Sequence, residues 1–289
     1  MGTERKRGTG IKDTVKAPFN YTGNKHRIIN QLEELFPSDI GTMVDLFCGG
    51  CDVTVNTPAK VKYANDNQEW LIDIMRTIQQ TPIEDILGHI DMTIDEWGLS
   101  KENLNAFLGL RDFYNQTRNP LDLYTLMCFS FNNQFRFNRS YEYNSSFGRN
   151  RGGFTGSMRE NLIAFKERIG GVNLSARDFR DFDFSVLHKG DFLYADPPYR
   201  ISCAVYNERF RGWDAEDDRN LMNLLDELDG RGVKFALSNV TEHKGVRNEG
   251  LIRWMRKYHV HEVKVNYGNC NYHREHRELP TREVLIVNY

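Results

Sequence analysis

The chain has 289 residues, of which 39% are hydrophobic, 12% aromatic and 27% charged, and this composition excludes an intrinsically disordered protein. The length suffices for a full α/β core together with one insertion or small second domain. The formal net charge of −2 excludes a globally basic protein, so any affinity for nucleic acid must come from a local patch.

The N-terminus and the cysteines indicate the compartment. No run approaches the roughly 18 apolar residues of a membrane span, and the start of the chain has no signal-peptide core. The five cysteines are odd in number and scattered, which is typical of reduced thiols. We therefore expect a cytoplasmic protein without a membrane partner. Residues 1–16, rich in Gly, Lys and Arg, are expected to form a flexible basic tail.

The first structured segment is a Gly-containing loop, Pro18 to Lys25, which opens a helix with apolar spacing up to Phe36. Free N–H groups at such a helix start, together with the charge of Lys25, can accept an anion. A strand from Thr42 to Phe47 carries Asp45 and then breaks at Cys48-Gly-Gly-Cys51. This pattern is typical of the first half of a mononucleotide-binding unit.

A second strand, residues 61–66, ends in Asp66 about 20 residues after the first, where doubly wound sheets place a carboxylate on ribose hydroxyls. The full G-x-G-x-x-G pattern is absent, which argues against a dinucleotide. The Cys48–Cys51 pair could instead serve redox chemistry or zinc. No second pair and no suitably spaced histidines complete a metal site, so we expect no metal.

Two unlike stretches follow. Residues 67–131 have helical spacing throughout, which predicts several successive helices and hence an inserted helical subdomain. Residues 132–159 carry five arginines against one acid, interleaved with aromatic residues, and a hairpin is expected near Tyr141 to Ser146. Arginine and asparagine pair with guanine and adenine edges, and aromatic rings pack or wedge against bases. The alternative is a solvated loop.

The second half of the chain returns to alternating strands and helices. Helices are expected over Met158–Ile169, 214–229 and 251–258, and strands over residues 172–175, 191–195, 233–238, 260–265 and 283–288. The strand at 172–175 ends near Asp178. No internal repeat is present.

The strand at 191–195 runs directly into Asp196-Pro197-Pro198-Tyr199. The prolines lack N–H donors, so the chain must leave the sheet there in a stiff turn. A carboxylate beside an aromatic ring on such a turn can accept hydrogen bonds from an exocyclic amino group while the ring stacks on the heterocycle. An ordinary strand end with a Pro-Pro stop is the alternative.

Taken together, Tyr21-Thr-Gly-Asn-Lys25, Asp45-Leu-Phe-Cys-Gly-Gly50, Asp66 and Asp196-Pro-Pro-Tyr199 resemble the Dam family of DNA adenine N6-methyltransferases, and bacteriophage Dam enzymes in particular. The resemblance spans residues 18 to about 289. It implies S-adenosylmethionine as methyl donor, double-stranded DNA as partner, and no metal or obligate protein partner. It also implies a Rossmann-like sheet ending in an antiparallel strand, with an inserted helical target-recognition subdomain and β-hairpin. A phage-encoded enzyme would act in the host cytoplasm.

Site residues follow from the same resemblance. The catalytic motif would be Asp196, Pro197, Pro198 and Tyr199, which would hold the flipped adenine. The cofactor-binding residues would be Tyr21, Lys25, Asp45, Phe47, Gly49, Asp66, Asp178 and Asp196. The DNA-contacting residues would be Asn133, Arg136, Asn138, Arg149 and Arg151. Cys51-Asp52 departs from many relatives, which have small residues there.

The expected organisation is a tail over 1–16, a catalytic domain made of 17–79 and 157–289, and a target-recognition insertion over 80–156. The expected reaction is methyl transfer to N6 of adenine, with GATC, the commonest target in the family, as the leading recognition site and a role in restriction-modification. Alternatives are a cytosine-N4 methyltransferase, an RNA adenine methyltransferase and a non-catalytic nucleic-acid-binding module. The acid at the head of the Pro-Pro-Tyr motif favours adenine.

Overall fold

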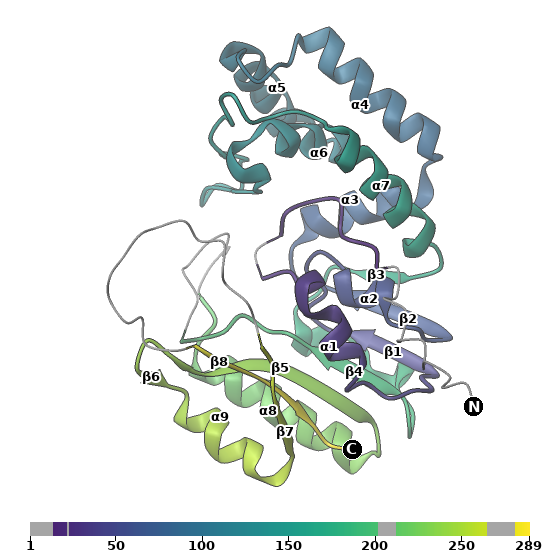
Figure 1. Ribbon diagram of the computed structural model, residues 1–289, viewed down its shortest axis with the longest axis vertical. Helices are drawn as coiled ribbons and strands as arrows, with labels where there is room; N and C mark the ends of the chain where they lie inside the picture. The colour runs from purple at the N-terminus through teal and green to yellow at the C-terminus, as the bar shows by residue number, and fades with distance from the viewer. Residues whose placement is uncertain (1–13, 22, 202–211, 265–280) are drawn as a thin grey trace, which may run out of the picture.

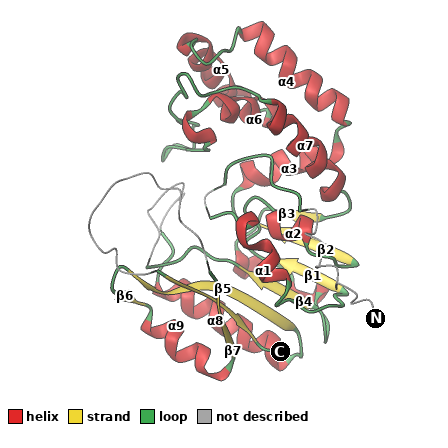
Figure 2. Ribbon diagram, viewed as in Figure 1, coloured by secondary structure: helices red, strands yellow, loops and turns green. Residues whose placement is uncertain are grey.

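The computed structural model describes residues 14–21, 23–201, 212–264 and 281–289. A mixed sheet flanked by helices occupies one part of the molecule, and a unit made mostly of helices occupies the other (Figures 1 and 2). In the described ranges, no helix has the length and apolar character needed to cross a membrane.

The sheet is largely parallel. In spatial order its path is β3 (Asn173–Ser175), β2 (Val61–Asn65), β1 (Thr42–Asp45), β4 (Phe192–Ala195), β5 (Lys234–His243), β8 (Arg282–Val287) and β7 (His259–Glu262), and the short β6 (Val246–Arg247) pairs with β5. Strands β3 to β5 are parallel, whereas β8 runs antiparallel between β5 and β7. The predicted α/β fold with an antiparallel strand near its end is confirmed.

The strand order reverses between β1 and β4, because β2 and β3 extend the sheet to one side of β1 while β5 extends it to the other side of β4. Ligands of open α/β sheets bind at such a switch point, beyond the carboxyl ends of the strands. Both strands are buried on both faces, which explains their apolar sequences. The two acids that end these strands therefore meet at the switch point.

Alternate side chains of β1 and β4 face two different layers of helices. Met43, Phe192 and Tyr194 pack with residues of η1 (His26–Ile28), α1 (Ile29–Glu33) and α2 (Asp52–Asn56). Val44, Leu193 and Ala195 pack with α8 (Ala215–Gly230) and α9 (Glu249–Trp254), and also with η3 (Phe179–Asp181). The remaining single turns are η4 (Phe184–Val186) and η5 (Met255–Lys257).

The helical unit contains α3 (Glu69–Gln80), α4 (Ile83–Trp97), α5 (Leu104–Thr117), α6 (Pro120–Phe129), η2 (Phe131–Asn133) and α7 (Gly156–Ile169). Helix α6 is buried from Leu121 to Phe129 and packs against α3, α4 and α5. The predicted run of successive helices is confirmed. Helices α3 and α7 lie outside the expected insertion, 80–156, yet share one hydrophobic core with α4 to α6, so packing joins the insertion to the helices on either side of it.

Several elements differ in extent from the sequence expectation. Strand β5 continues to His243 because it pairs with both β8 and β6. The helix expected up to Phe36 divides into η1 and the short α1. The end of the strand expected over 260–265 lies outside the described residues, and so does most of the expected tail. The last residues of that tail are anchored, since the Val15 N–H donates to Asn56 Oδ1 over 2.8 Å.

Candidate active site and nucleic-acid interface

Asp45 lies at the end of β1 with its carboxyl group almost fully buried. Its Oδ2 accepts a hydrogen bond from the Thr54 hydroxyl at 2.6 Å, whereas its Oδ1 is buried and has no hydrogen-bond partner among the described residues. Burial, together with the charges of Asp196 and Asp66, raises the pKa of Asp45 to about 7 against the lowering effect of the Thr54 bond. The fold therefore holds an unsatisfied acid at the switch point.

Asp66 follows β2 and organises the glycine turn after β1. Its two oxygens accept from the N–H groups of Gly49 and Gln68, each at 3.0 Å. Burial raises the pKa of Asp66 to about 6 in spite of these bonds. At Gly49 the φ angle is +46°, and a Cβ atom there would lie 2.8 Å from Cε1 of the Tyr21 ring. Glycine is thus required for the N-terminal loop to lie against this turn.

Asp196 follows β4 and is neutralised by Lys25. The Lys25 Nζ lies 2.5 Å from Asp196 Oδ2 and also donates to the Gly23 carbonyl at 3.1 Å. The Tyr199 hydroxyl donates to Asp196 Oδ1 at 2.7 Å, and the Lys25 ammonium lies 5.2 Å from the centroid of the Tyr199 ring. The expected motif residues are therefore brought together, with Lys25 placed on Asp196, a contact that the sequence did not predict.

The N-terminal loop is anchored by two polar residues of α2 that sequence reasoning missed. Asp52 accepts from the Ala17 N–H at 2.9 Å, and Asn56 both accepts from and donates to the backbone of Val15 at 2.8 Å. Cys51, which precedes this helix, has a left-handed backbone and contacts Met75. Many relatives have small residues at positions 51 and 52. Here Asp52 holds the loop that carries Tyr21 and Lys25.

An aromatic cluster lies on the other side of the glycine turn. The Phe47 ring is 5.5 Å from both Phe179 and Trp213, measured between centroids. Trp213 was missed because nothing in its local sequence marks it. Asp178, expected to meet the adenine of the cofactor, binds Arg180 through both oxygens at 2.7 and 2.6 Å. Asp178 thus lies next to Phe179 of the cluster with its carboxylate ion-paired, and its expected contact with the cofactor stays a prediction.

The Arg-rich stretch shows a division that the sequence interpretation did not make. Phe135, Phe137 and Tyr143 are buried in the core of the helical unit, and Trp70 stacks near the first two rings. The expectation that the interleaved aromatics pack against bases is therefore wrong for these three. The signal was present, because Phe135-Arg136-Phe137 alternates apolar and charged residues, and such alternation places one set inward.

The expected hairpin exists, but its turn lies earlier than predicted. Phe137 pairs with Tyr143 in an isolated antiparallel bridge, and the turn between them is closed by Asn138, whose side chain accepts from the Glu142 N–H at 2.9 Å. The Asn133 amide donates to the Cys128 carbonyl at 2.9 Å. Both asparagines therefore maintain turns of this stretch, and their expected contacts with DNA stay a prediction.

Three arginines of this stretch are exposed and unpaired among the described residues. Arg136, Arg149 and Arg151 are exposed, and their side chains make no hydrogen bond or ion pair with any residue that the structure describes. Gly148 lets the backbone before Arg149 approach α6, since a Cβ atom there would lie 2.7 Å from the Ser130 carbonyl oxygen. The three arginines are thus exposed, and the backbone next to Arg149 packs closely against the end of α6.

Phe131 is an aromatic residue that sequence reasoning passed over. Its side chain is 50% exposed, at the end of α6, where Asn132 and Asn133 both have left-handed φ angles. The Phe131 N–H donates to the Ser146 carbonyl at 2.7 Å, and the Asn20 amide donates to the Asn132 carbonyl at 3.0 Å. The bond from Asn20 ties the N-terminal loop to the Arg-rich stretch.

Comparison with known proteins agrees with this geometry. The model of the D12 class N6 adenine-specific DNA methyltransferase family matches residues 21–269. The chain belongs to this family. The expected place among DNA adenine N6-methyltransferases is confirmed at the level of the family.

Three curated relatives are all bacterial, so the expected closeness to bacteriophage enzymes is not supported. The chain is 42% identical to type II methyltransferase M.FokI of Planomicrobium okeanokoites, over 95% of this chain and 43% of that protein. It is 43% identical to modification methylase StsI of Streptococcus sanguinis, over 98% and 44%. It is 33% identical to modification methylase LlaI of Lactococcus lactis subsp. lactis, over 96% and 44%. The chain thus spans less than half the length of these relatives.

The residues at the switch point fit the cofactor that the family implies. S-Adenosylmethionine carries a sulfonium, an ammonium and a ribose, and the site offers three carboxylates, Asp45, Asp66 and Asp196, against one lysine. The buried Asp45 Oδ1 without a partner is a place for a donor such as an ammonium. In the part of the chain that the structure describes, no group of three His, Cys, Asp or Glu residues could hold a metal ion.

Proposed function

We propose that this chain transfers a methyl group from S-adenosylmethionine to N6 of an adenine turned out of duplex DNA. The observation that supports this most is the meeting of Asp45, Asp66 and Asp196 at the switch point, with Tyr199 hydrogen-bonded to Asp196. Flipping is required because the amino group of a paired base is inaccessible inside the stack.

The donor would be held by Tyr21, Asp45, Phe47, Gly49, Asp66 and Asp178. When bound, it supplies an electrophilic methyl group. Asp45 would accept from its ammonium through the unpaired Oδ1, and Asp66 would accept from the ribose hydroxyls while keeping its bonds to the Gly49 and Gln68 N–H groups. Lys25, which pairs with Asp196, is better assigned to the catalytic motif than to the cofactor.

The target adenine would be held by Asp196, Pro197, Pro198 and Tyr199. Both oxygens of Asp196 are engaged in the structure, one by the Lys25 ammonium and one by the Tyr199 hydroxyl. The amino group of adenine would replace the neutral Tyr199 hydroxyl, because displacing the ammonium would leave a buried charge unpaired. Asp196 and the Pro197 carbonyl then fix the amino nitrogen while Tyr199 stacks, so positioning and electrostatics lower the barrier.

DNA would be held by the exposed Arg136, Arg149 and Arg151. Asn133 and Asn138 are left out of this proposal, because their amides maintain the turns of the stretch. Residues 80–156 would form the target-recognition part, and 17–79 with 157–289 the catalytic part. GATC is the first recognition sequence to test. The relatives named as modification methylases support a role beside a restriction enzyme.

The test is transfer of labelled methyl groups to duplex DNA, duplexes lacking adenine, and RNA. We expect label at N6 of adenine in one short duplex sequence, and its loss in Asp196→Asn, where folding and donor binding are retained. Transfer to cytosine would instead favour the N4 alternative, and transfer only to RNA the RNA enzyme. Donor binding with no transfer to any nucleic acid would refute the proposal.

A further inference from the structure

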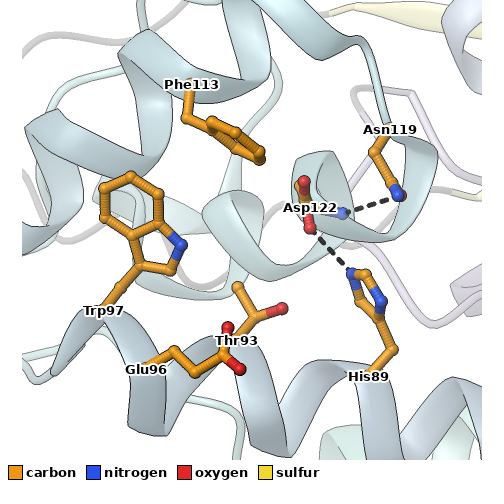
Figure 3. A pocket seen from close by; sticks show the side chains of 7 residues that line it. All are labelled: His89, Thr93, Glu96, Trp97, Phe113, Asn119 and Asp122. Carbon is orange, nitrogen blue, oxygen red and sulfur yellow. Dashed lines mark hydrogen bonds and ion pairs between the residues drawn. The ribbon is translucent and has the colours of Figure 1, made fainter.

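A cavity of about 580 Å³ lies in the helical unit (Figure 3). Helix α4 and helix α5 contribute walls, and the first turn of α6 closes the third side. The lining residues are His89, Thr93, Glu96, Trp97, Phe113, Asn119 and Asp122. None of them belongs to the motifs that carry the proposed function.

Two polar groups in this cavity have no hydrogen-bond partner among the residues that the structure describes. Thr93 is only 7% exposed, yet its hydroxyl makes no hydrogen bond with a described residue, unlike Thr77 and Thr125, which bond to the carbonyl four residues earlier. The Trp97 indole N–H also lacks a described acceptor, although the indole N–H groups of the other three tryptophans each have one. Both groups are therefore free to hydrogen-bond a ligand in the cavity that they line.

The charge of the cavity selects a cation. Asp122 is 5% exposed and uses only Oδ1 for its 2.7 Å contact with His89 Nε2, which leaves Oδ2 for a ligand. Glu96 lies across the cavity from it (Figure 3). Helix α4 contains five Asp or Glu residues and no Lys or Arg. Such a field repels the phosphates of DNA and attracts cations.

The aromatic walls narrow the class of cation. The rings of Trp97 and Phe113 are 5.6 Å apart between centroids, with 47° between their planes, and Phe113 is 43% exposed. Flat guanidinium groups stack on aromatic faces and bind carboxylates with several N–H groups, whereas an ammonium is a compact point charge. We propose that this cavity binds a guanidinium group, with Asp122 and Glu96 as acceptors and a neighbouring carbonyl of the ligand accepting from Trp97.

The test uses calorimetric titration of the whole chain with N-acetyl-arginine amide. Its matched control is N-acetyl-citrulline amide, which has nearly the same shape without the charge. Because charge-assisted hydrogen bonds are worth ~1.5 to 3 kcal/mol each, the citrulline compound is expected to bind at least about tenfold more weakly. Titration with a short peptide containing arginine then distinguishes a protein partner from a small molecule as the source of the guanidinium group. Tighter binding than the amide indicates a protein partner, and equal binding indicates a small molecule.

Two variants assign any binding to the cavity. Glu96→Gln and Thr93→Val should each weaken binding several-fold, while Asp95→Asn, a neutralisation on the exposed side of the same helix, should leave it unchanged. Methyl transfer in all three should equal that of the parent chain, which separates this proposal from the proposed function. The proposal is overturned if arginine and citrulline compounds bind equally or not at all, or if Asp95→Asn has the same effect as Glu96→Gln.

Discussion

Asp45 should make the affinity for S-adenosylmethionine depend on pH. Its pKa is raised to about 7 mainly by burial, so the carboxyl group is largely protonated at pH 5.5 and largely ionised at pH 8. A cationic ligand group bound at Oδ1 requires the ionised form. We therefore expect the dissociation constant to fall as pH rises through about 7, and Asp45→Asn, which keeps the shape and a Thr54 acceptor, to lose this dependence.

The magnitude follows from linkage. With a pKa of about 7 in the free protein and ionisation required for binding, Asp45 alone improves the affinity about 25-fold between pH 5.5 and 7.5. Asp66, with a pKa of about 6, adds about 4-fold over the same range. The ratio of parent to Asp45→Asn affinity isolates the Asp45 contribution, because the titrations of Asp66 and of the donor's own amino group are common to both proteins.

The assay is calorimetric titration with the donor at several pH values. Near pH 7 the parent chain should also release about half a proton from Asp45 per donor bound, and the variant should not. A ratio of affinities that stays within twofold from pH 5.5 to 7.5 would show that Asp45 does not face the donor's cation. If the ratio of affinities changes with pH but Asp45→Asn releases as many protons as the parent chain, another acid is responsible for the proton release.

The folding stability of the free protein should change with pH in the sense opposite to that of donor affinity. Because the folded pKa of Asp45, about 7, lies above its unfolded value of 3.8, this group favours folding most below pH 3.8 and progressively less as pH rises to 7. Above pH 7 the ionised carboxylate costs about 4 kcal/mol. Asp45→Asn should therefore raise the melting temperature of the free chain at pH 8 while it weakens donor binding, a combination that loss of packing cannot produce.

Further outcomes concern DNA and the loop after the catalytic motif. If Arg136 or Arg149 reads a base, its replacement by Ala should cost ~1 to 3 kcal/mol of binding free energy for the cognate duplex. If it contacts phosphate, the replacement should weaken binding to all duplexes alike and reduce the slope of log affinity against log salt concentration by about 0.9. Phe131→Ser should weaken duplex binding without changing the melting temperature, because the ring is half exposed; an unchanged affinity would exclude it from the interface. Arg200 binds Asp218 at 2.9 Å, so Arg200→Met should lower kcat more than it changes donor affinity, and equal losses would indicate a general loss of structure.

Local patterns predicted the elements that place the site. Asp45 ends its strand, Asp66 and Asp196 directly follow theirs, and parallel strands bring their carboxyl ends to one edge, so the meeting of these acids could be predicted from the strands. The succession of helices after residue 67 was likewise visible in its spacing. Gly49 was expected among the cofactor-binding residues, and in the structure its neighbour is the Tyr21 ring.

Contacts between distant segments could not be predicted. Asp52 and Asn56 resemble ordinary polar residues of a helix start, and only the folded chain shows that they hold Ala17 and Val15. The aromatic residues of the Arg-rich stretch were assigned to DNA because composition alone was considered. Their alternation with polar residues carried the better signal, since buried rings on one side oblige the arginines to lie on the other.

Lys25 shows why such contacts decide the chemistry. Its sequence position, in a Gly-containing loop before a helix, suggested an anion of the cofactor, but its ammonium pairs with Asp196. Without it, three carboxylates would share one poorly solvated edge without the positive charge that Lys25 places there. Lys25 thus sets its ammonium against one oxygen of Asp196, whereas Asp45 keeps an oxygen with no hydrogen-bond partner among the described residues. The two acids are therefore prepared for different roles, Asp196 as part of a formed ion pair and Asp45 as an acceptor still open to a donor.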